Sequence, residues 1–314
     1  MAVQKLCFEM LSEYKMCKLH TSQGERIHFN LMRPGWDIYN ITAPFVLHGE
    51  RLIAGRVEPR DSEDSQVRIF RQVKHQWEAV TEAAPLHLQD PFVTFVSGQL
   101  VLGGVEIFPD QQDKSKWNWR TAFYCGDEIT SLKRFAEGPE GMKDIRIKEL
   151  PDGKILVFTR PQGERGGRGK IGCTIINNLY ELTPSLLQEA PLIDDHFTDA
   201  EWGGVNEIHL LQGGLVGALS HIACFDEAGD RHYYASCFAM NPVTRECSDM
   251  KIIACRDDFP AGDAKRPDLM DVLFSGGLIR HGDGMATLYC GVSDAEAHRL
   301  RLPDPFGEYE SHAL

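Results

Sequence analysis

The chain has 314 residues, of which 42% are hydrophobic, and it carries a formal net charge of -13 with a pI of about 5.4. This length and hydrophobic content are enough for a sizeable buried core. A chain this acidic is a poor candidate for binding nucleic acid or an anionic membrane, because both need clustered Lys and Arg.

The N-terminal segment, MAVQKLCFEMLSEYK, has no apolar stretch of signal-peptide length, and a short helix is expected over residues 6–13. The nine cysteines of the chain include no CxxC pair, so their spacing predicts neither a disulfide framework nor a zinc site. Scattered reduced thiols favour a cytoplasmic protein. The longest uncharged run, IHLLQGGLVGALSHIACF, predicts strand-turn-strand and not a membrane span. No sequence feature calls for a metal or redox cofactor.

Most of the chain shows short apolar alternation punctuated by glycine, which is typical of all-β proteins; a second short helix is expected over 181–189. The turns of five predicted hairpins are centred on His48-Gly49, Ser97-Gly98, Asp152-Gly153, Gly213-Gly214 and Asp283-Gly284. They lie about 50 to 70 residues apart, which leaves room for one four-stranded blade per interval. We therefore predict an all-β five-bladed β-propeller, a single domain over residues 1–314 with a short N-terminal extension. A β-sandwich or jelly-roll pair is the alternative.

A propeller binds its ligand in the axial funnel, so the polar residues that open each predicted blade are candidate site residues. In the first blade, a segment containing Asn40 leads to a strand on which Arg56, Glu58 and Arg60 share one face. Those charges suit either a solvated outer face or a wall that binds sugar hydroxyls. In the second blade, Asp90 precedes a proline, an arrangement common in turns.

Two tryptophans follow in the second predicted blade. Trp117 and Trp119 fall on one face of a strand, and Arg120 falls on the other. The tryptophans suit the core or a platform for a sugar ring. Arg120 is a candidate contact for an anion.

The third predicted blade carries a local cationic patch in an otherwise acidic protein, made of Lys143, Arg146, Arg160, Arg165, Arg168 and Lys170, with Asp144 among them. The patch suits an exposed loop or a site for phosphate or a nucleotide diphosphate, because the Gly-rich ERGGRGK segment can bring backbone amides close to an anion. In the fourth blade, His221 lies on a strand and Tyr233 follows a turn, and in the fifth Asp294 comes just after a strand. A single histidine on a strand is most often a core residue.

Taken in order, these segments resemble glycoside hydrolase family 130, the five-bladed mannoside phosphorylases. They are more similar still to its relatives, the mannosyltransferase/phosphorylases of glycosyltransferase family 108. QDPF at 89–92 stands where family 130 has Glu-Asp-Pro-Arg, and KDIRIKELPDGKILVFTRP matches its Lys-Asp and His-Arg-Pro motifs. LSHIA, YYASCFA and SGGLIRHGDGMATLYCGVSD match the later motifs. The resemblance covers roughly residues 40–302.

The resemblance implies that Asp90 is the catalytic general acid of an inverting enzyme. Its nucleophile is inorganic phosphate, so no second catalytic carboxylate is needed. Lys143 and Arg160 match phosphate-contacting positions of the family. For Arg120 the same role is predicted from its place on the strand and not from the resemblance. The implied substrate-binding residues are Asn40, Arg56, Glu58, Asp144, His221, Tyr233 and Asp294.

Three positions depart from family 130: Gln89 and Phe92 flank the acid, and Thr159 replaces the histidine of His-Arg-Pro. These departures leave room for a GDP-mannose donor. The expected partners are a β-1,2-linked oligomannoside acceptor and inorganic phosphate, mannose 1-phosphate or GDP-mannose. Two alternatives belong to other classes. One is a phosphate-independent hydrolase of the arabinanase type, which would need a catalytic base and a pKa-modulating carboxylate besides the acid, with Asp37 or Glu207 as candidates. The other is a non-catalytic propeller scaffold.

Overall fold

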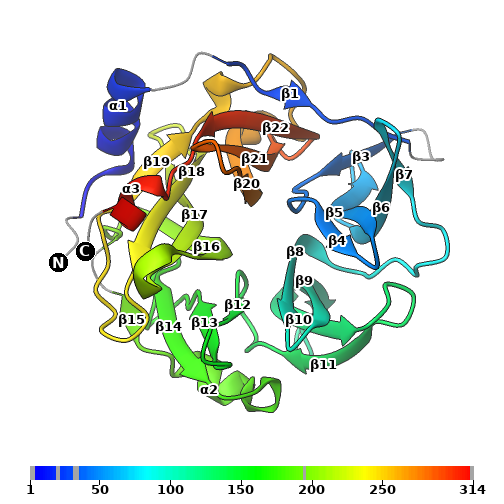
Figure 1. Cartoon of the computed structure of the whole chain (residues 1–314). Helices are drawn as coiled ribbons and strands as arrows, with labels where there is room; N and C mark the ends of the chain where they lie inside the picture. The colour runs from blue at the N-terminus through cyan, green and yellow to red at the C-terminus, as the bar shows by residue number, and fades with distance from the viewer. Residues whose placement is uncertain (1–3, 19–21, 31–34, 194–195, 312–314) are drawn as a thin grey trace.

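The computed structural model describes residues 4–18, 22–30, 35–193 and 196–311. Strands make up nearly all of its regular structure, and the sheets are arranged in a ring around a centre (Figure 1). The α-helices are short and lie on the outside of the ring: α1 (Cys7–Cys17), α2 (Pro184–Gln188) and α3 (Gly307–Ser311). The predicted all-β class is confirmed, and α1 and α2 correspond to the two expected helices.

Three of the sheets are separate and mostly antiparallel; the exception is the parallel pairing of β2 with β7 in the first. The first has the order β2-β7-β6-β5-β3, with β4 also on β5, and contains β2 (Phe29–Asn30), β3 (Trp36–Tyr39), β4 (Phe45–Leu47), β5 (Glu50–Pro59), β6 (Gln66–Val73) and β7 (Gln76–Ala79). The second contains β8 (Gln89–Val96), β9 (Gln99–Pro109), β10 (Trp117–Gly126) and β11 (Lys133–Glu137). The third contains β12 (Arg146–Glu149), β13 (Ile155–Thr159), β14 (Ile171–Ile176) and β15 (Leu192–Ile193).

The fourth sheet has eight strands and consists of two antiparallel runs. Its members are β16 (Trp202–Leu210), β17 (Val216–Phe225), β18 (Arg231–Met240), β19 (Lys251–Ala254), β20 (Asp271–Arg280), β21 (Met285–Val292), β22 (Glu296–Pro303) and β1 (Glu25–Arg26). The runs are joined where β18 pairs in parallel with β20 over two residue pairs, His232 with Asp271 and Tyr233 with Val272. The strands of the described residues therefore form four hydrogen-bonded sheets and do not by themselves establish a count of five blades.

All five predicted hairpins form, and they are β4-β5, β8-β9, β12-β13, β16-β17 and β20-β21. Three of their turns have left-handed backbone at both central residues, and one of these is the Gly213-Gly214 turn. The other two are the two-residue turns of β4-β5 and β8-β9. The φ angles are 49° at His48 and 82° at Gly49, and 51° at Ser97 and 78° at Gly98. Two-residue hairpin turns of this kind match the natural twist of the paired strands. The turn residues thus fix the register of each hairpin locally.

The strands nearest the centre of the ring carry irregularities that position the site (Figure 1). The register shifts between Gln89 and Phe92 in β8, between Val205 and Glu207 in β16, and between Ser275 and Gly277 in β20. A bulge bends a strand and re-aims its side chains. The bulge in β8 contains Asp90.

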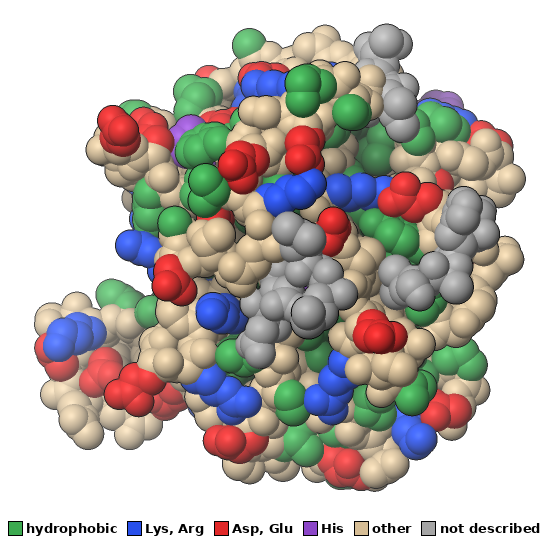
Figure 2. All heavy atoms as spheres, turned by 90° about the vertical axis from the view of Figure 1, so that its left-hand side faces the viewer, with side chains coloured by type: hydrophobic (Ala, Val, Ile, Leu, Met, Phe, Trp, Pro, Cys, Tyr) green, Lys and Arg blue, Asp and Glu red, His purple; other side chains and the backbone are tan. Residues whose placement is uncertain are grey.

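The outer surface mixes charges of both signs. Figure 2 shows acidic and basic side chains interspersed on the side of the ring that carries α1 and α3. No helix within the described ranges is long and apolar enough to cross a membrane.

The bulge of β20 packs directly against the segment before β4, and this contact gives a test of the ring. A Cβ at Gly276 would lie 1.7 Å from the carbonyl oxygen of Ile41, so Gly276→Ala must displace backbone. We expect this variant to lower the free energy of unfolding by about 1–3 kcal/mol or more in urea titrations.

Gly282→Ala is the matched control on the same hairpin, because a Cβ at Gly282 would meet nothing within 4 Å. It should be neutral or slightly stabilising. Equal stability of the two variants would contradict the close contact between β20 and Ile41.

Candidate active site

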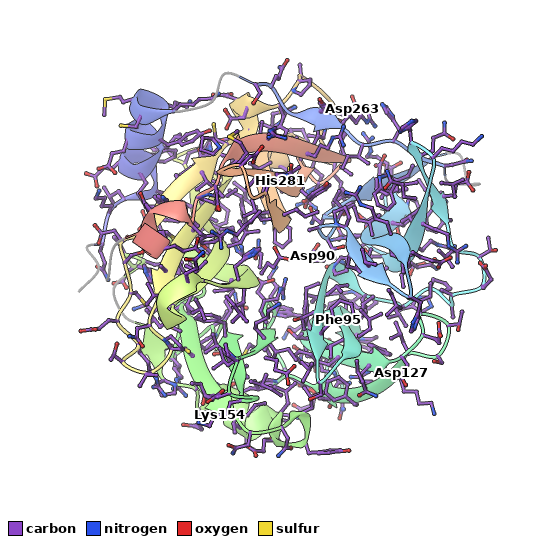
Figure 3. All side chains as sticks on the ribbon, in the orientation of Figure 1. Asp90, Phe95, Asp127, Lys154, Asp263 and His281 are labelled. Atoms are coloured by element: carbon purple, nitrogen blue, oxygen red, sulfur yellow. The ribbon has the colours of Figure 1, made fainter. Side chains whose placement is uncertain are left out.

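Asp90 lies near the middle of the ring (Figure 3) and is 8% exposed. Its carboxylate accepts a hydrogen bond of 2.7 Å from Asn40 Nδ2 and one of 3.3 Å from Arg56 Nη1. Gly291 leaves the space that Asn40 needs, because a Cβ there would lie 1.8 Å from Asn40 Oδ1. The carboxylate of Asp90 is therefore held by two buried donors from the first sheet.

Four of the predicted site residues share an uncommon backbone conformation. The φ angle is 44° at Asn40, 49° at Asp90, 59° at Asp144 and 49° at Asp294. Left-handed backbone costs a non-glycine residue about 1 kcal/mol, although Asp and Asn tolerate it best. Such strain gathers at functional sites, where the surrounding structure enforces it. This left-handed backbone sets the direction in which each of the four polar side chains points.

Glu58 is fully buried and is the most heavily hydrogen-bonded carboxylate of the site. It pairs with Arg56 at 3.0 Å, and Tyr39, Ser65 and Lys265 also donate to it. Burial alone would raise the pKa of Glu58, but Arg56 and the three donors outweigh burial and lower it. Glu58 is thus a fixed negative charge that orients Arg56.

Asp294 lies in the turn between β21 and β22 and is half-buried. Burial raises its pKa, the positive charge of Arg56 opposes this rise, and the negative charges of Asp90 and Glu58 add to it. Asp294 therefore retains a proton to higher pH than an ordinary aspartate.

Asp144 and Arg160 form a second buried pair. Arg160 Nη1 donates to Asp144 Oδ2 at 3.2 Å, and Arg160 Nε donates to the carbonyl of Gly203 at 2.9 Å. Burial would raise the pKa of Asp144, but the positive charges of Arg160 and Lys143 outweigh burial and lower the pKa to about 2. Asp144 Oδ1 has no hydrogen-bond partner among the described residues, so it can accept a hydrogen bond from a ligand.

His221 is buried beside this pair and is uncharged at neutral pH. Burial lowers its pKa to about 3, despite the opposing attraction of Asp144. Its Nδ1 lies 3.0 Å from Asn206 Oδ1, and its ring stacks on Tyr233 with centroids 5.6 Å apart. Trp202 Nε1 donates to the Tyr233 hydroxyl at 2.9 Å. The aromatic rings form one wall of the site.

A pocket of about 360 Å³ lies next to these residues, and its lining includes Gln89, Lys143, Arg160 and Tyr233. The remaining lining residues are Val105, Ile107, Trp119, Gln162, Arg168, Trp202, Phe225 and Arg231. The pocket brings together four cations and four aromatic rings. Its lining contains no carboxylate within the part of the chain that the structure describes.

The Gly-rich loop after β13 folds closely over Arg160. Gly169 has φ 146°, and a Cβ there would lie 2.6 Å from Arg160 Nε. A Cβ at Gly166 would lie 1.9 Å from the carbonyl oxygen of Pro161. Only glycine fits at these two positions, which explains the composition of the ERGGRGK segment.

Two cations of the pocket, Arg168 and Lys143, can pair with an anionic ligand without first losing a carboxylate partner. Arg168 is exposed and lies over the rings of Phe225, at 5.1 Å, and Trp202, at 5.7 Å. Neither Arg168 nor Lys143 forms an ion pair with a carboxylate of the described residues. Arg160 and Arg231 are paired instead, with Asp144 and Asp268.

Arg120 lies outside this pocket. Its guanidinium pairs with Glu106 at 2.7 Å and with Glu137 at 2.8 Å, and it lies over the ring of Phe108. Its predicted contact with phosphate remains a prediction, and the geometry favours Lys143 and Arg160. The two neighbouring tryptophans have different environments: Trp119 lines the pocket, and Trp117 is 62% exposed.

The two carboxylates considered as a hydrolytic base are engaged elsewhere. Asp37 pairs with Arg60. Glu207 accepts from the backbone amide of Leu278 at 2.6 Å and lies 2.9 Å from His209 Nε2. Glu207 also lines a separate pocket of about 170 Å³ between inner strands.

Sequence reasoning did not select Lys265, Ser65, Tyr39, Trp202, Phe225 or Arg231. Lys265 meets Glu58 across 207 positions of sequence, and no local pattern marks it. The double aromatic stacking of Arg168 also depends on residues distant in sequence. Trp119, by contrast, was a candidate platform in the sequence, and it lines the pocket.

The family described as "Protein of unknown function (DUF1861)" matches residues 14–308. The structure of MPT-4, a mannose phosphorylase from Leishmania mexicana in complex with phosphate ion, is 32% identical, has a TM-score of 0.87, and covers 96% of this chain and 94% of that chain. MPT-1, a GDP-Man-dependent mannosyltransferase from the same organism, is 32% identical, with a TM-score of 0.86 and coverage of 96% and 95%. The chain belongs to this mannosyltransferase/phosphorylase family.

More distant structures share the fold. A β-1,2-mannobiose phosphorylase from Listeria innocua is 14% identical, has a TM-score of 0.64, and covers 90% of this chain and 94% of that chain. No curated protein matches the chain. The resemblance to glycosyltransferase family 108 and the prediction of a glycosyltransferase or glycoside phosphorylase are thereby confirmed.

The pKa of Asp144 gives a pH-dependent prediction for this family member. Because folding lowers that pKa from 3.8 to about 2, the carboxylate stabilises the fold above pH 4, and this contribution is lost as the pH falls towards 2. Asp144→Asn should therefore unfold at lower urea concentration than wild type. The difference in unfolding free energy between wild type and Asp144→Asn should be about 1 kcal/mol smaller at pH 3 than at pH 7.

Asp199→Asn, at an exposed position, is the control and should show no such narrowing. A gap for Asp144→Asn that is the same at pH 3 and pH 7 would contradict the lowered pKa.

Proposed function

We propose that this protein is an inverting β-mannosyl phosphorylase or mannosyltransferase that acts on β-1,2-linked oligomannosides. It exchanges a mannosyl group between an acceptor sugar and a phosphate oxygen, using inorganic phosphate and mannose 1-phosphate, or GDP-mannose. The observation that carries the proposal is the position of one candidate acid, Asp90, beside a cationic pocket without a carboxylate in its described lining.

Phosphorolysis by this site needs one proton transfer and one displacement. Asp90 gives its proton to the glycosidic oxygen, directly or through a sugar hydroxyl, as the bond between that oxygen and the anomeric carbon breaks. A phosphate oxygen attacks the same carbon from the opposite face, so the configuration inverts and a sugar phosphate forms. Arg56 and Asn40 then stabilise the carboxylate left on Asp90, since both already donate to it.

The transferred sugar would be bound by groups whose protonation states differ. Asp144 stays ionised, and its Oδ1, which accepts no hydrogen bond from the described residues, can accept one from a sugar hydroxyl. His221 stays neutral, and Asp294 more readily keeps a proton, so each can bind a hydroxyl without adding full charge. Arg56 and Glu58 complete the wall on the first sheet. Tyr233 stacks on His221 and lines the adjacent pocket.

The anion would be bound by Lys143, Arg160 and Arg168. Two of these lack a carboxylate partner in the described part of the chain, so a phosphate dianion gains from both charges without breaking an existing ion pair. The relative MPT-4 binds a phosphate ion, which supports this assignment. The relative MPT-1 uses GDP-Man, and Trp202 and Phe225 offer aromatic surface to a nucleotide donor in the same pocket.

Hydrolysis fits the site less well than phosphorolysis. An inverting hydrolase needs a carboxylate base to activate water opposite the leaving group. Asp37 and Glu207 have other partners, and the cationic pocket supplies no base from its described lining. A pocket of this charge attracts an anion in place of water.

We also infer that the ring is a single five-bladed propeller domain. Each antiparallel run contains one of the five confirmed hairpins, and the eight-stranded sheet divides into two runs at the short β18-β20 pairing. A cytoplasmic location is inferred from the chemistry of the thiols, since no disulfide joins any of the nine cysteines.

The proposed role of Asp90 is tested by product release. Wild type incubated with β-1,2-mannobiose should form mannose 1-phosphate only when phosphate is present. Asp90→Asn should lower kcat by about 10²- to 10⁴-fold, the usual contribution of a general acid. Asp127→Asn, far from the centre of the ring, should retain wild-type activity.

Each other outcome of these assays would indicate a different function. Free mannose without phosphate would indicate a hydrolase. Extension of the mannoside from GDP-mannose, with no phosphorolysis, would place the chain with the transferases. Inactivity in all three assays would leave a scaffold and contradict the proposal.

The proposed anion site is tested by the Michaelis constant for phosphate. Lys143→Met should raise KM for phosphate by about 10- to 100-fold, because one charged hydrogen bond is lost. Arg120→Met is the control, since Arg120 is paired with Glu106 and Glu137. A larger effect at Arg120 than at Lys143 would move the phosphate site away from the pocket.

A further inference from the structure

Lys265 is a buried lysine that no step of the proposed reaction uses. It lies in the connection between β19 and β20, and its side chain is 5% exposed. Its Nζ pairs with Glu58 and lies 2.9 Å from Glu63 Oε1. A lysine is rarely buried to this extent unless its charge is compensated, and here a buried carboxylate of the candidate site compensates it.

The backbone of Lys265 makes a second contact with the candidate site. Its amide donates to the carbonyl of Ser293 at 3.0 Å, and Arg256 Nε donates to Ser293 Oγ at 3.0 Å. Ser293 directly precedes Asp294, and both residues have left-handed backbone, with φ angles of 53° and 49°. The β19-β20 connection therefore supports the turn that presents Asp294.

Lys265 thus joins two parts of the funnel that come from opposite ends of the chain. Through Nζ it holds Glu58, which holds Arg56, which donates to Asp90. Through its amide it holds the turn of Asp294.

Loss of the Lys265 ammonium would remove the first contact of this series, the one between Lys265 and Glu58. Glu58 would keep a buried negative charge with fewer donors, and Glu63 would lose one of its cations. Both changes draw Arg56 towards the glutamates and away from Asp90. A displacement of about 1 Å at a catalytic group can cost on the order of 10²-fold in rate.

We propose that Lys265 is a positioning residue that ties Arg56 and Glu58 to the turn of Asp294 and thereby fixes the geometry around Asp90. Its effect on turnover rests on the proposed function. The tie between the two segments does not, because it is defined by contacts within the protein.

Three variants test this role. Lys265→Met removes the charge and keeps the backbone contact with Ser293. Lys265→Arg keeps a cation at the same place. Arg266→Met is the matched control, because Arg266 is the adjacent cation, is half-exposed and contacts Glu63 at 3.5 Å without reaching Glu58.

The kinetic readout is mannose 1-phosphate formation at a temperature well below the Tm of every variant. Lys265→Met should lower kcat on the order of 10²-fold and leave KM for phosphate unchanged, because the anion pocket is built from other residues. Lys265→Arg should recover most of kcat, and Arg266→Met should match wild type. Lys265→Gln, which keeps a hydrogen-bond donor, takes the place of Lys265→Met if that variant does not fold.

Two outcomes would overturn the proposal. In one, Lys265→Met keeps wild-type kcat. In the other, Arg266→Met loses as much activity as Lys265→Met, which would indicate a general effect of charge on the loop.

A structural readout separates this proposal from the proposed function. If wild type is inactive in all three assays, the proposed function fails and amide hydrogen exchange decides the role of Lys265. Faster exchange at residues 56–58 and 293–294 in Lys265→Met, but not in Arg266→Met, supports the tie. Unchanged exchange in Lys265→Met overturns it.

Discussion

The buried guanidinium of Arg56 is the interaction on which the centre of this protein depends. It lies between two carboxylates, Glu58 at 3.0 Å and Asp90 at 3.3 Å, from different sheets. An unpaired buried cation would be strongly destabilising, so the two sheets are held in the arrangement that keeps both carboxylates in reach. The bulge in β8 and the left-handed backbone at Asp90 are the local means by which the second carboxylate arrives there.

The charges of the site divide into two regions with different properties. Around Asp90, Arg56 and Glu58, nearly every charge is compensated by a buried partner, which favours fixed geometry and defined protonation states. In the pocket beside it, Lys143 and Arg168 form no ion pair with a carboxylate of the described residues. Such a division suits a reaction in which a neutral sugar is held rigidly and an anion enters and leaves.

The local features of the fold were predictable from the sequence, because glycine and its neighbours determine each hairpin turn. His48-Gly49 and Ser97-Gly98 predicted hairpins through their capacity for left-handed backbone, and the strands on either side pair as expected. The order of the short motifs identified the family and gave Asp90, Asp144 and Arg160 as site residues. In the structure Asp144 and Arg160 form a buried ion pair, and Asp90 lies near the middle of the ring.

Features that depend on long-range contacts could not be predicted from the sequence. Nothing near Arg120 indicated that Glu106 and Glu137 would occupy its guanidinium, since that pairing depends on the register of β9, β10 and β11. The parallel contact of β18 with β20 merges two runs of strands into one sheet, and two residue pairs leave no pattern in the sequence.

The pairing of β1 with β22 has a consequence for how the protein folds. Glu25 and Arg299, which face each other across this pair, are 274 positions apart, so the contact closes a loop that contains nearly all the other strands. Closing so long a loop is entropically costly, and contacts of such sequence separation form slowly. During synthesis the last sheet lacks its outer strand pairing until β22 has left the ribosome, and the earlier hairpins, which close short loops, can form first. Because the ring is completed late, its final sheet is the part most exposed to competing intermolecular strand pairing while the chain is being made.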